Sequence, residues 1–230
     1  MQLELLSTLG LQGALRELIP AFEAATGIRL NSEFGPTVVQ MQRIAAGATA
    51  DVAILTEAGI DQLIAAGTML AGSRTDLARS VVGFAVRPGA PKPDISSADA
   101  VKETLLAVKS MVYSRAGASG IFFAGLIDRL GIAAEVNAKA TIIPSGFTGE
   151  KLVSGEAELA VQQISELMEV PGIDIVGPLP ASLGSETIFS AGLFAASARQ
   201  EAARAFVAFL STQSAAAMIA RTGLEPLAGG

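Results

Sequence analysis

The sequence predicts a two-lobed α/β protein in which each lobe is a mainly parallel sheet flanked by helices. Short strand-like runs alternate with helix-length amphipathic segments from the first residues onward, and this alternation is typical of parallel sheets with helical crossovers. A proline-rich stretch at 88–93 interrupts the series, and a second alternating series follows it. Half of the 230 residues are hydrophobic, which is enough for one sizeable core or two smaller ones.

The first third of the chain has the pattern of three strand–helix pairs. Strands are predicted at 3–7, 28–33 and 52–55, and helices at 11–25, 38–46 and 58–66. In the first helix the apolar residues recur on one face, and Gly27 stands where a C-terminal cap belongs. An apolar run at 80–86 then leads out of the first lobe.

The second series supplies a smaller sheet and the return to the first lobe. Helices are predicted at 98–108 and 120–130, and strands at 110–113, 141–143, 159–162 and 173–176. Two further helices, at 199–210 and 213–220, end the chain. We predict lobe 1 as residues 1–82 plus 191–230 and lobe 2 as residues 83–190, with hinge strands near 80–87 and 187–195.

The composition excludes several kinds of chemistry. The chain has no histidine and no cysteine, which excludes the usual zinc sites, His-dependent nucleophilic triads and disulfides. A net charge of −6 without a basic stripe argues against nucleic acid as a partner. Every apolar stretch is too short to span a bilayer, so no membrane insertion is expected. We expect a monomer that needs neither a metal nor a cofactor.

The N-terminal segment has no signal-peptide pattern. Residues 1–6 lack a basic region, a sustained apolar region and a cleavage site. Two interpretations stay open: the protein is periplasmic if a signal peptide was removed, and cytoplasmic otherwise.

Four loops rich in glycine and hydroxyl residues follow predicted strands and precede helices, at 7–10, 34–37, 114–120 and 145–149. Ligands of open α/β sheets bind at such carboxyl ends, where helix N-termini favour anions. Ser, Thr and Gly are also ordinary cap and turn residues, and Ser119 is the expected cap of its helix. The candidate ligand-binding residues are Ser7, Thr8, Leu9, Pro36, Thr37, Arg115, Ser119, Gly120, Phe147, Thr148 and Gln163.

Two side-chain types at strand ends fit an anionic ligand. Arg115 follows the strand that ends at Tyr113, and its guanidinium can take a carboxylate in two hydrogen bonds. An exposed arginine is, however, often a solvated side chain that binds no ligand. Gln162 and Gln163 leave another strand, and because neighbouring residues point to opposite faces only one of them can face a ligand. The sequence leaves open which one.

Several segments resemble the molybdate-binding-protein-like, type II periplasmic binding proteins of ABC transporters. The similar segments are the strand ending at Ser7-Thr8, the helix end 22–27, the run 44–54 with its Ala-Asp-Val strand start, Ser119-Gly120 with the helix end 130–131, residues 155–159, and residues 209–211 leading to 223–224. The resemblance spans nearly the whole chain. It implies two lobes joined by two crossover strands, with the ligand between them.

The resemblance also implies where an oxyanion is held, and the sequence departs from it there. Ser7, Thr37, Ser119 and Phe147 match positions that furnish hydroxyl and backbone contacts in the family. The tyrosine that commonly reaches the anion in molybdate binders falls at Gln163 here, and Arg115 adds a charge where the family uses neutral dipoles. The ligand is therefore a small organic carboxylate or a molybdate-like oxyanion, with the carboxylate favoured.

Three functions remain open, and the first is favoured. One is a non-enzymatic receptor that closes around its anion and, if exported, delivers it to an ABC permease. The second is an enzyme resembling aconitate isomerase on the same fold, with Arg115 as anchor and Tyr113, Glu150 or Lys151 as the base that moves an allylic proton. The third is a cytoplasmic sensor whose closure is recognised by a partner protein.

Overall fold

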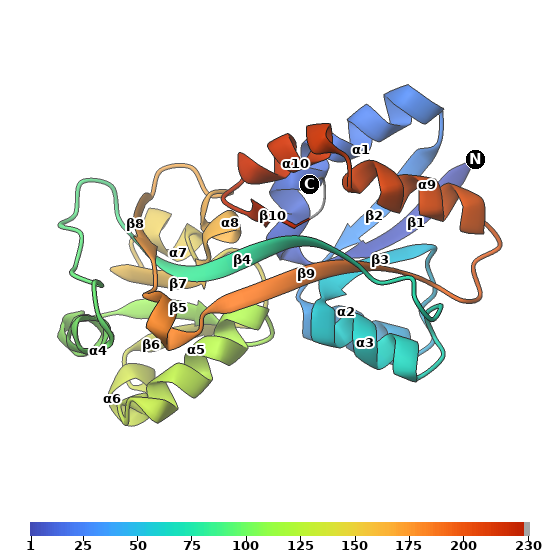
Figure 1. Ribbon diagram of the computed structural model, residues 1–230. Helices are drawn as coiled ribbons and strands as arrows, with labels where there is room; N and C mark the ends of the chain where they lie inside the picture. The colour runs from blue at the N-terminus through green and yellow to red at the C-terminus, as the bar shows by residue number, and fades with distance from the viewer. Residues whose placement is uncertain (228–230) are drawn as a thin grey trace. The chain divides into compact units, whose positions relative to one another are not determined.

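Two compact units make up the chain, and each is described by itself (Figure 1). The computed structural model describes residues 1–227. Unit 1 is Met1–Ser80 with Thr187–Gly230, and unit 2 is Val81–Glu186. The chain enters unit 2 within strand β4, Thr75–Val86, and returns to unit 1 at the start of strand β9, Glu186–Leu193.

Unit 1 is built on parallel strands. Strand β1 lies between β2 and β3 and is parallel to both, while β9 is antiparallel to β3, and β10 is antiparallel to the first part of β4. The elements of this unit are β1 Gln2–Ser7, α1 Gln12–Thr26, β2 Arg29–Phe34, α2 Thr37–Ala45, β3 Val52–Thr56, α3 Glu57–Ala65, α9 Gln200–Leu210, α10 Gln213–Ala220 and β10 Glu225–Pro226.

Both faces of this sheet are covered by helices, as Figure 1 shows. In β3, Ile54 packs into a cluster with Leu15 of α1 and Phe206 of α9, while its neighbour Leu55 packs with Ile60 of α3. Side chains alternate along a strand, so a strand with apolar residues at every position must be buried on both sides. The four-residue run Val52–Leu55 is therefore buried throughout.

Unit 2 repeats the arrangement on a smaller scale. Strand β5 lies between β6 and β7 and is parallel to both, and the second part of β4 pairs antiparallel with β7 and β8. The elements of this unit are α4 Ala98–Ala107, β5 Met111–Ser114, α5 Ala118–Arg129, α6 Ala133–Asn137, β6 Ala140–Ile143, α7 Glu150–Val153, β7 Leu159–Gln163, α8 Ile164–Leu167 and β8 Asp174–Pro178.

The core of unit 2 also lies on two sides of its sheet. Tyr113 of β5 packs with Phe123 of α5, and the two rings are 5.0 Å apart. Its neighbour Val112 packs instead with Leu152 of α7 and Leu167 of α8. Helices α5 and α6 therefore cover one face, and α7 and α8 cover the other.

The structure confirms the predicted α/β class and the predicted order of strands and helices. It differs from the prediction in three details. Strand β4 begins at Thr75, earlier than the apolar run, because polar Asp76 and Arg79 in its first part are paired with Ser190 and Glu225 and hide the strand from a hydrophobicity pattern. Helices α6 and α8 were not predicted, since each has at most five residues.

The third difference is a correction at the start of α5. The N-cap is Gly117, and Ser119 lies inside the first turn of the helix. The prediction that Ser119 caps this helix is wrong, because the helix begins at Ala118, two residues closer to the strand end. Ser119 is therefore a side chain of the first turn whose hydroxyl is not used by the cap.

The buried carboxylate of Asp51 joins separate segments of unit 1. Asp51 is 1% exposed and accepts hydrogen bonds from the backbone of Glu4 (2.8 Å), from Ser197 Oγ (2.5 Å) and from Arg199 Nε (3.0 Å). These groups belong to β1 and to the segment that follows β9. A single carboxylate thus accepts from three donors in two segments distant in sequence.

We expect Asp51→Ala to lower the free energy of unfolding by about 2–4 kcal/mol, because it leaves a buried backbone donor and a guanidinium without their acceptor. The matched control is Asp61→Ala, which removes a more exposed ion pair with Arg74 and should cost less than about 1 kcal/mol. Urea unfolding followed by circular dichroism measures both. Equal effects of the two substitutions would contradict the role given to Asp51.

Candidate functional site

The first group of predicted site residues lies at the carboxyl edge of the unit 1 sheet. Ser7 ends β1 and is fully buried, with its hydroxyl donating to Thr8 O at 3.1 Å. Its carbonyl accepts from Gly35 N at 3.0 Å, which brings the Gly35–Thr37 turn beside the end of β1. Parallel strands end at the same edge, so this closeness follows from the pairing of β1 with β2.

Two helices begin at this edge, and they leave hydroxyls unused. Thr8 precedes a short 3-10 helix at Leu9–Leu11 without capping it, and Pro36 precedes α2. Thr37 is the first residue of α2, and its buried Oγ1 has no hydrogen-bond partner within the described residues. A buried hydroxyl without a partner is rare and calls for an explanation. The N-terminus of α2 is also where a helix attracts anions, which can accept from such a hydroxyl.

The second group lies where β5 meets α5 in unit 2. The hydroxyls of Ser114 and Ser119 are buried, and neither has a hydrogen-bond partner in residues 1–227. Both lie around the N-cap: a β carbon placed on Gly117 would be 2.8 Å from Ser114 Oγ and 3.7 Å from Ser119 Oγ. Residue 120, in the first turn of α5, has room only for glycine, because a β carbon there would lie 1.8 Å from Ser114 O. The helix start and two free hydroxyls thus occupy one small volume.

Arg115 carries the positive charge of this group. Its backbone N–H donates to Ile143 O at 2.8 Å, which joins the ends of β5 and β6. Its side chain is exposed, and no carboxylate of the described residues pairs with it. The guanidinium is therefore available to a ligand that reaches the end of β5.

Gln162 holds the third loop, Ser145–Gly149. Its Oε1 accepts from Thr148 N at 2.7 Å and from Thr148 Oγ1 at 2.8 Å, and its Nε2 donates to Gly146 O at 2.9 Å. Thr148 is therefore fully engaged in the loop, and Phe147 beside it is partly buried. Of the two glutamines, Gln162 faces this loop, while Gln163 is buried at the N-cap position of α8.

The three residues considered as the base differ in how free their side chains are to contact a ligand. Tyr113 donates its hydroxyl to Asn137 Oδ1 at 2.7 Å on the α6 side of the sheet, and burial raises the pKa of its phenol. Lys151 pairs with Glu156 at 3.0 Å. Glu150 is exposed at the start of α7, directly after the Ser145–Gly149 loop. The structure therefore leaves Glu150 as the most accessible of the three.

Glu166 is a functional candidate that the sequence analysis missed. It lies in α8, is 5% exposed, and has no ion-pair partner in the described chain. Desolvation by burial raises the pKa of its carboxyl to about 7, although hydrogen bonds from the backbone of Gln163 and the side chain of Gln162 act in the opposite direction. A glutamate three residues after an N-cap is the signal that reveals such a group in a sequence.

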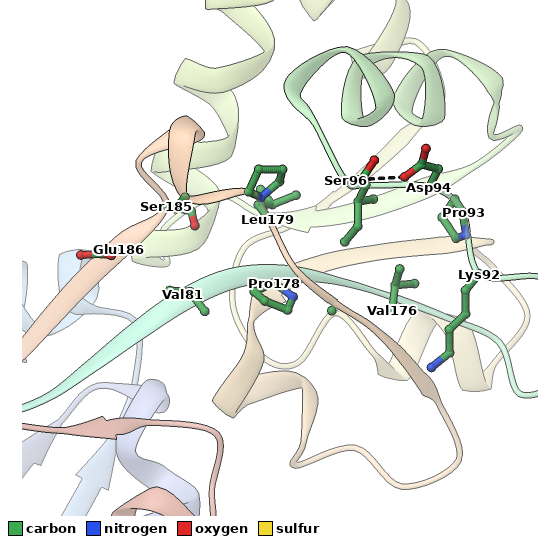
Figure 2. Close-up of a pocket in the computed structure, with 14 residues that line it drawn as sticks. Val81, Lys92, Pro93, Asp94, Ser96, Val176, Pro178, Leu179, Ser185 and Glu186 are labelled. Carbon is green, nitrogen blue, oxygen red and sulfur yellow. Dashed lines mark hydrogen bonds between the residues drawn. The ribbon is translucent and has the colours of Figure 1, made fainter.

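A groove of about 720 Å³ lies elsewhere in unit 2 (Figure 2). It is lined mainly by apolar side chains such as Val176 and Leu179, and it contains none of the predicted site residues. Asp94 accepts a hydrogen bond from Ser96 N at 2.8 Å at its rim, and Lys92 Nζ donates to Ile175 O at 2.6 Å. Its polar side chains are thus partly engaged with one another and with the backbone.

The described residues show two further absences. Residues 1–227 contain no group of three or more His, Cys, Asp or Glu side chains placed to hold a metal ion. In the same range no single helix is long and apolar enough to cross a membrane, and the bent pair α9–α10 meets the criterion only when the two helices are taken together.

Comparison with known proteins gives the family. Residues 3–225 match the model of the bacterial extracellular solute-binding proteins. This chain belongs to that family. An aconitate isomerase of Pseudomonas sp. is 39% identical over 231 residues, covering 98% of this chain and 88% of that protein.

Solved structures of solute-binding proteins share the fold. The periplasmic molybdate-binding protein of Azotobacter vinelandii is 20% identical, with a TM-score of 0.82 over 96% of this chain and 98% of that one. The sulfate-binding protein of Mycobacterium tuberculosis H37Rv is also 20% identical, with a TM-score of 0.79 over 99% and 87%. The predicted resemblance to molybdate-binding proteins of type II fold is confirmed.

We expect Gly120→Ala to destabilise the protein by more than about 3 kcal/mol, because its β carbon cannot avoid the carbonyl of Ser114 without moving the backbone. Gly125→Ala, in the same helix, is the control. There the nearest heavy atom would be Arg129 Nη1 at 3.4 Å, so the change should be neutral or stabilise by up to about 1 kcal/mol. Chemical denaturation of both variants decides the matter, and a well-tolerated Gly120→Ala would contradict the packing of α5 against β5.

The raised pKa of Glu166 predicts how stability depends on pH. The folded-state pKa of about 7 lies above the ordinary 4.5, so the folded protein binds the proton more tightly and stability falls as pH rises from about 4.5 until it levels off above about 7. The loss amounts to roughly 3 kcal/mol. Glu166→Gln should remove this fall. Urea midpoints at a series of pH values test it, and parallel profiles for the two proteins would refute the assignment.

Proposed function

We propose that the protein binds a small organic polycarboxylate of the aconitate class at the helix beginnings that carry its unused hydroxyls. The observation that carries the proposal is the set of buried hydroxyls without partners, Thr37 in unit 1 and Ser114 with Ser119 in unit 2. All three lie at helix beginnings, where backbone N–H groups and the helix dipole favour negative charge.

The available guanidinium of Arg115 fits an anion that can accept two parallel hydrogen bonds, and a carboxylate is such an anion. A planar carboxylate matches the fork of an arginine in two parallel hydrogen bonds. An anion with several carboxylates can place one of them on Arg115 and another on the hydroxyl of Ser119, in the same unit. The aconitate isomerase that shares 39% of its residues with this chain supports the same ligand class.

A second candidate function is isomerisation of the bound ligand, and the same relative favours it. A 1,3-proton shift in an unsaturated tricarboxylate needs one base and anchored carboxylates. The base removes a proton from the methylene carbon, the double bond moves to that carbon, and the base returns the proton to the carbon that was formerly vinylic. In this proposal Glu150 is the base and Arg115 holds one carboxylate of the ligand. The N-terminus of α5 stabilises the negative charge that develops on the ligand when the proton is removed.

Without this chemistry the same site serves a receptor. A permease of the ABC type then receives the ligand if the protein is exported. Receptor and isomerase share the binding step, so binding is tested first.

Calorimetric titration with trans-aconitate, cis-aconitate, citrate, sulfate and molybdate tests the binding proposal. We expect the tricarboxylates to bind, Arg115→Gln to weaken them about 10- to 100-fold through loss of a charge-assisted pair, and Thr37→Val and Ser119→Ala to weaken them several-fold. Arg129→Gln, at the far end of α5, is the charge-matched control. Binding of molybdate or sulfate without any tricarboxylate would overturn the proposal.

Proton NMR of cis-aconitate incubated with the protein tests the second candidate. Appearance of the trans isomer, lost in Glu150→Gln while calorimetric binding persists, supports an isomerase with Glu150 as its base. Tight binding with no interconversion would exclude the isomerase and leave the receptor. Interconversion that survives in Glu150→Gln would reject that residue as the base.

A further inference from the structure

Unit 1 contains a second pocket that none of the predicted site residues lines. Its volume is about 250 Å³, and its walls come from three segments of the unit. Ser73 and Thr75 lie at the start of β4, Leu193 ends β9, and Arg204 lies on α9. The pocket is smaller than the cavities that hold drug-sized ligands, so a small ion or molecule fits it best.

This pocket lies at the opposite edge of the sheet from the candidate binding loops of unit 1. Strand β9 is antiparallel to β3, and its last residue, Leu193, pairs with Val52, the first residue of β3. Ser7 lies instead at the carboxyl edge, at the end of β1, and Thr37 follows the end of β2. A ligand in this pocket is therefore separate from the polycarboxylate proposed above.

Arg204 gives the pocket a positive charge that the fold does not neutralise. Its side chain is exposed and makes no hydrogen bond, ion pair or ring contact with the other described residues. Most other arginines of residues 1–227 do have a partner: Arg221 pairs with Glu17 at 2.6 Å, and Arg129 lies over the ring of Phe122. The guanidinium of Arg204 is therefore free to bind an anion.

The acidic residues closest to the pocket in sequence do not line it. Asp76, in β4, pairs with Arg74 at 3.1 Å and accepts from Ser190 Oγ at 2.7 Å. Glu201 lies one turn before Arg204 in α9, is exposed, and makes no ion pair with it. Among the described residues that line the pocket, Arg204 is the one with a charged side chain.

Ser73 holds one wall of the pocket in place, and two donors on the same wall are unused. The buried Ser73 hydroxyl donates to Leu70 O at 2.8 Å and accepts from Leu193 N at 3.1 Å, which joins the turn before β4 to the end of β9. The hydroxyl of Thr75 and the backbone N–H of Gly72 also line the pocket, and neither has a hydrogen-bond partner within residues 1–227. Both can donate to a ligand.

The end of α9 argues against a cation in the same place. The last carbonyls of a helix carry partial negative charge and attract cations. Here Val207 O accepts from Ser211 Oγ at 3.1 Å, and Ala208 O accepts from Ser211 N at 3.1 Å. These bonds occupy acceptors that a cation would use, and the charge of Arg204 repels it. The pocket therefore suits an anion.

We propose that this pocket is a second anion site, which binds a phosphate-like oxyanion through the guanidinium of Arg204 and the hydroxyl of Thr75. The backbone N–H of Gly72 is a third donor. Such an oxyanion has several accepting oxygens around one small centre, so the guanidinium can take two of them and the other donors the rest. The phosphate group is either a free ion or the head group of a phosphate monoester, because the two present the same oxygens.

Two-dimensional NMR of the full chain, titrated with sodium phosphate at constant ionic strength, tests the site. We expect the Nε–H signal of Arg204 and the amide signals of Gly72 and Thr75 to shift together and to saturate. Arg204→Gln should weaken phosphate binding about tenfold, and Thr75→Val several-fold, as judged by the amide signals. Arg221→Gln removes an exposed arginine elsewhere in unit 1 and is the charge-matched control, which should bind phosphate as the wild-type protein does.

Glycerol phosphate in place of inorganic phosphate distinguishes the two sources of the anion. Equal affinity supports a site for the head group of an ester, and binding of inorganic phosphate alone supports a site for the free ion.

Three results would overturn the proposal: no saturable shift at Gly72 and Thr75, the same shifts with sodium chloride, or unchanged phosphate affinity in Arg204→Gln. Arg115→Gln separates this site from the proposed function. It should weaken the tricarboxylates and leave the phosphate shifts at Gly72 and Thr75 as they are. A protein that binds phosphate here and no tricarboxylate would reject the proposed function and keep the second site.

Discussion

The carboxyl ends of the parallel strands are the constraint on which the rest of the structure depends. In both units the central strands are buried on their two faces, as β3 and β5 show. A strand buried in this way offers polar groups only where it ends and a helix begins. The donors of the first turn then have no partner within the helix. Ser7, Thr37, Ser114 and Ser119 all lie at such points, so polar chemistry collects there without any dedicated domain.

Two carboxylates are buried away from these strand ends, and their surroundings differ. Asp51 meets a guanidinium, a hydroxyl and a backbone donor, all within unit 1. Glu166 meets only two neutral donors, and burial raises its pKa to about 7. Asp51 therefore joins β1 to the segment after β9 with the help of a cationic partner, whereas Glu166 is buried with neutral donors alone.

The family relationship and the site agree on anions and differ on chemistry. The structural relatives bind molybdate and sulfate by name, while the relative with the higher identity is an aconitate isomerase. A chain without histidine or cysteine can still move a proton with a carboxylate. Arg115 offers an exposed guanidinium that no carboxylate of the described residues pairs with, and such a group can take an anion in two hydrogen bonds.

The sequence by itself determined the α/β class, the order of elements and the loops at strand ends, because these follow from local periodicity and from caps such as Gly27. It did not determine that Gly117 is the N-cap of α5, since Ser119 is an equally good cap by residue type. The choice depends on the contact of Ser114 with the start of the helix. Nor did it choose between Gln162 and Gln163, place the Tyr113 hydroxyl on Asn137, or bury Glu166. Those choices depend on contacts between segments distant in sequence, which only the tertiary structure decides.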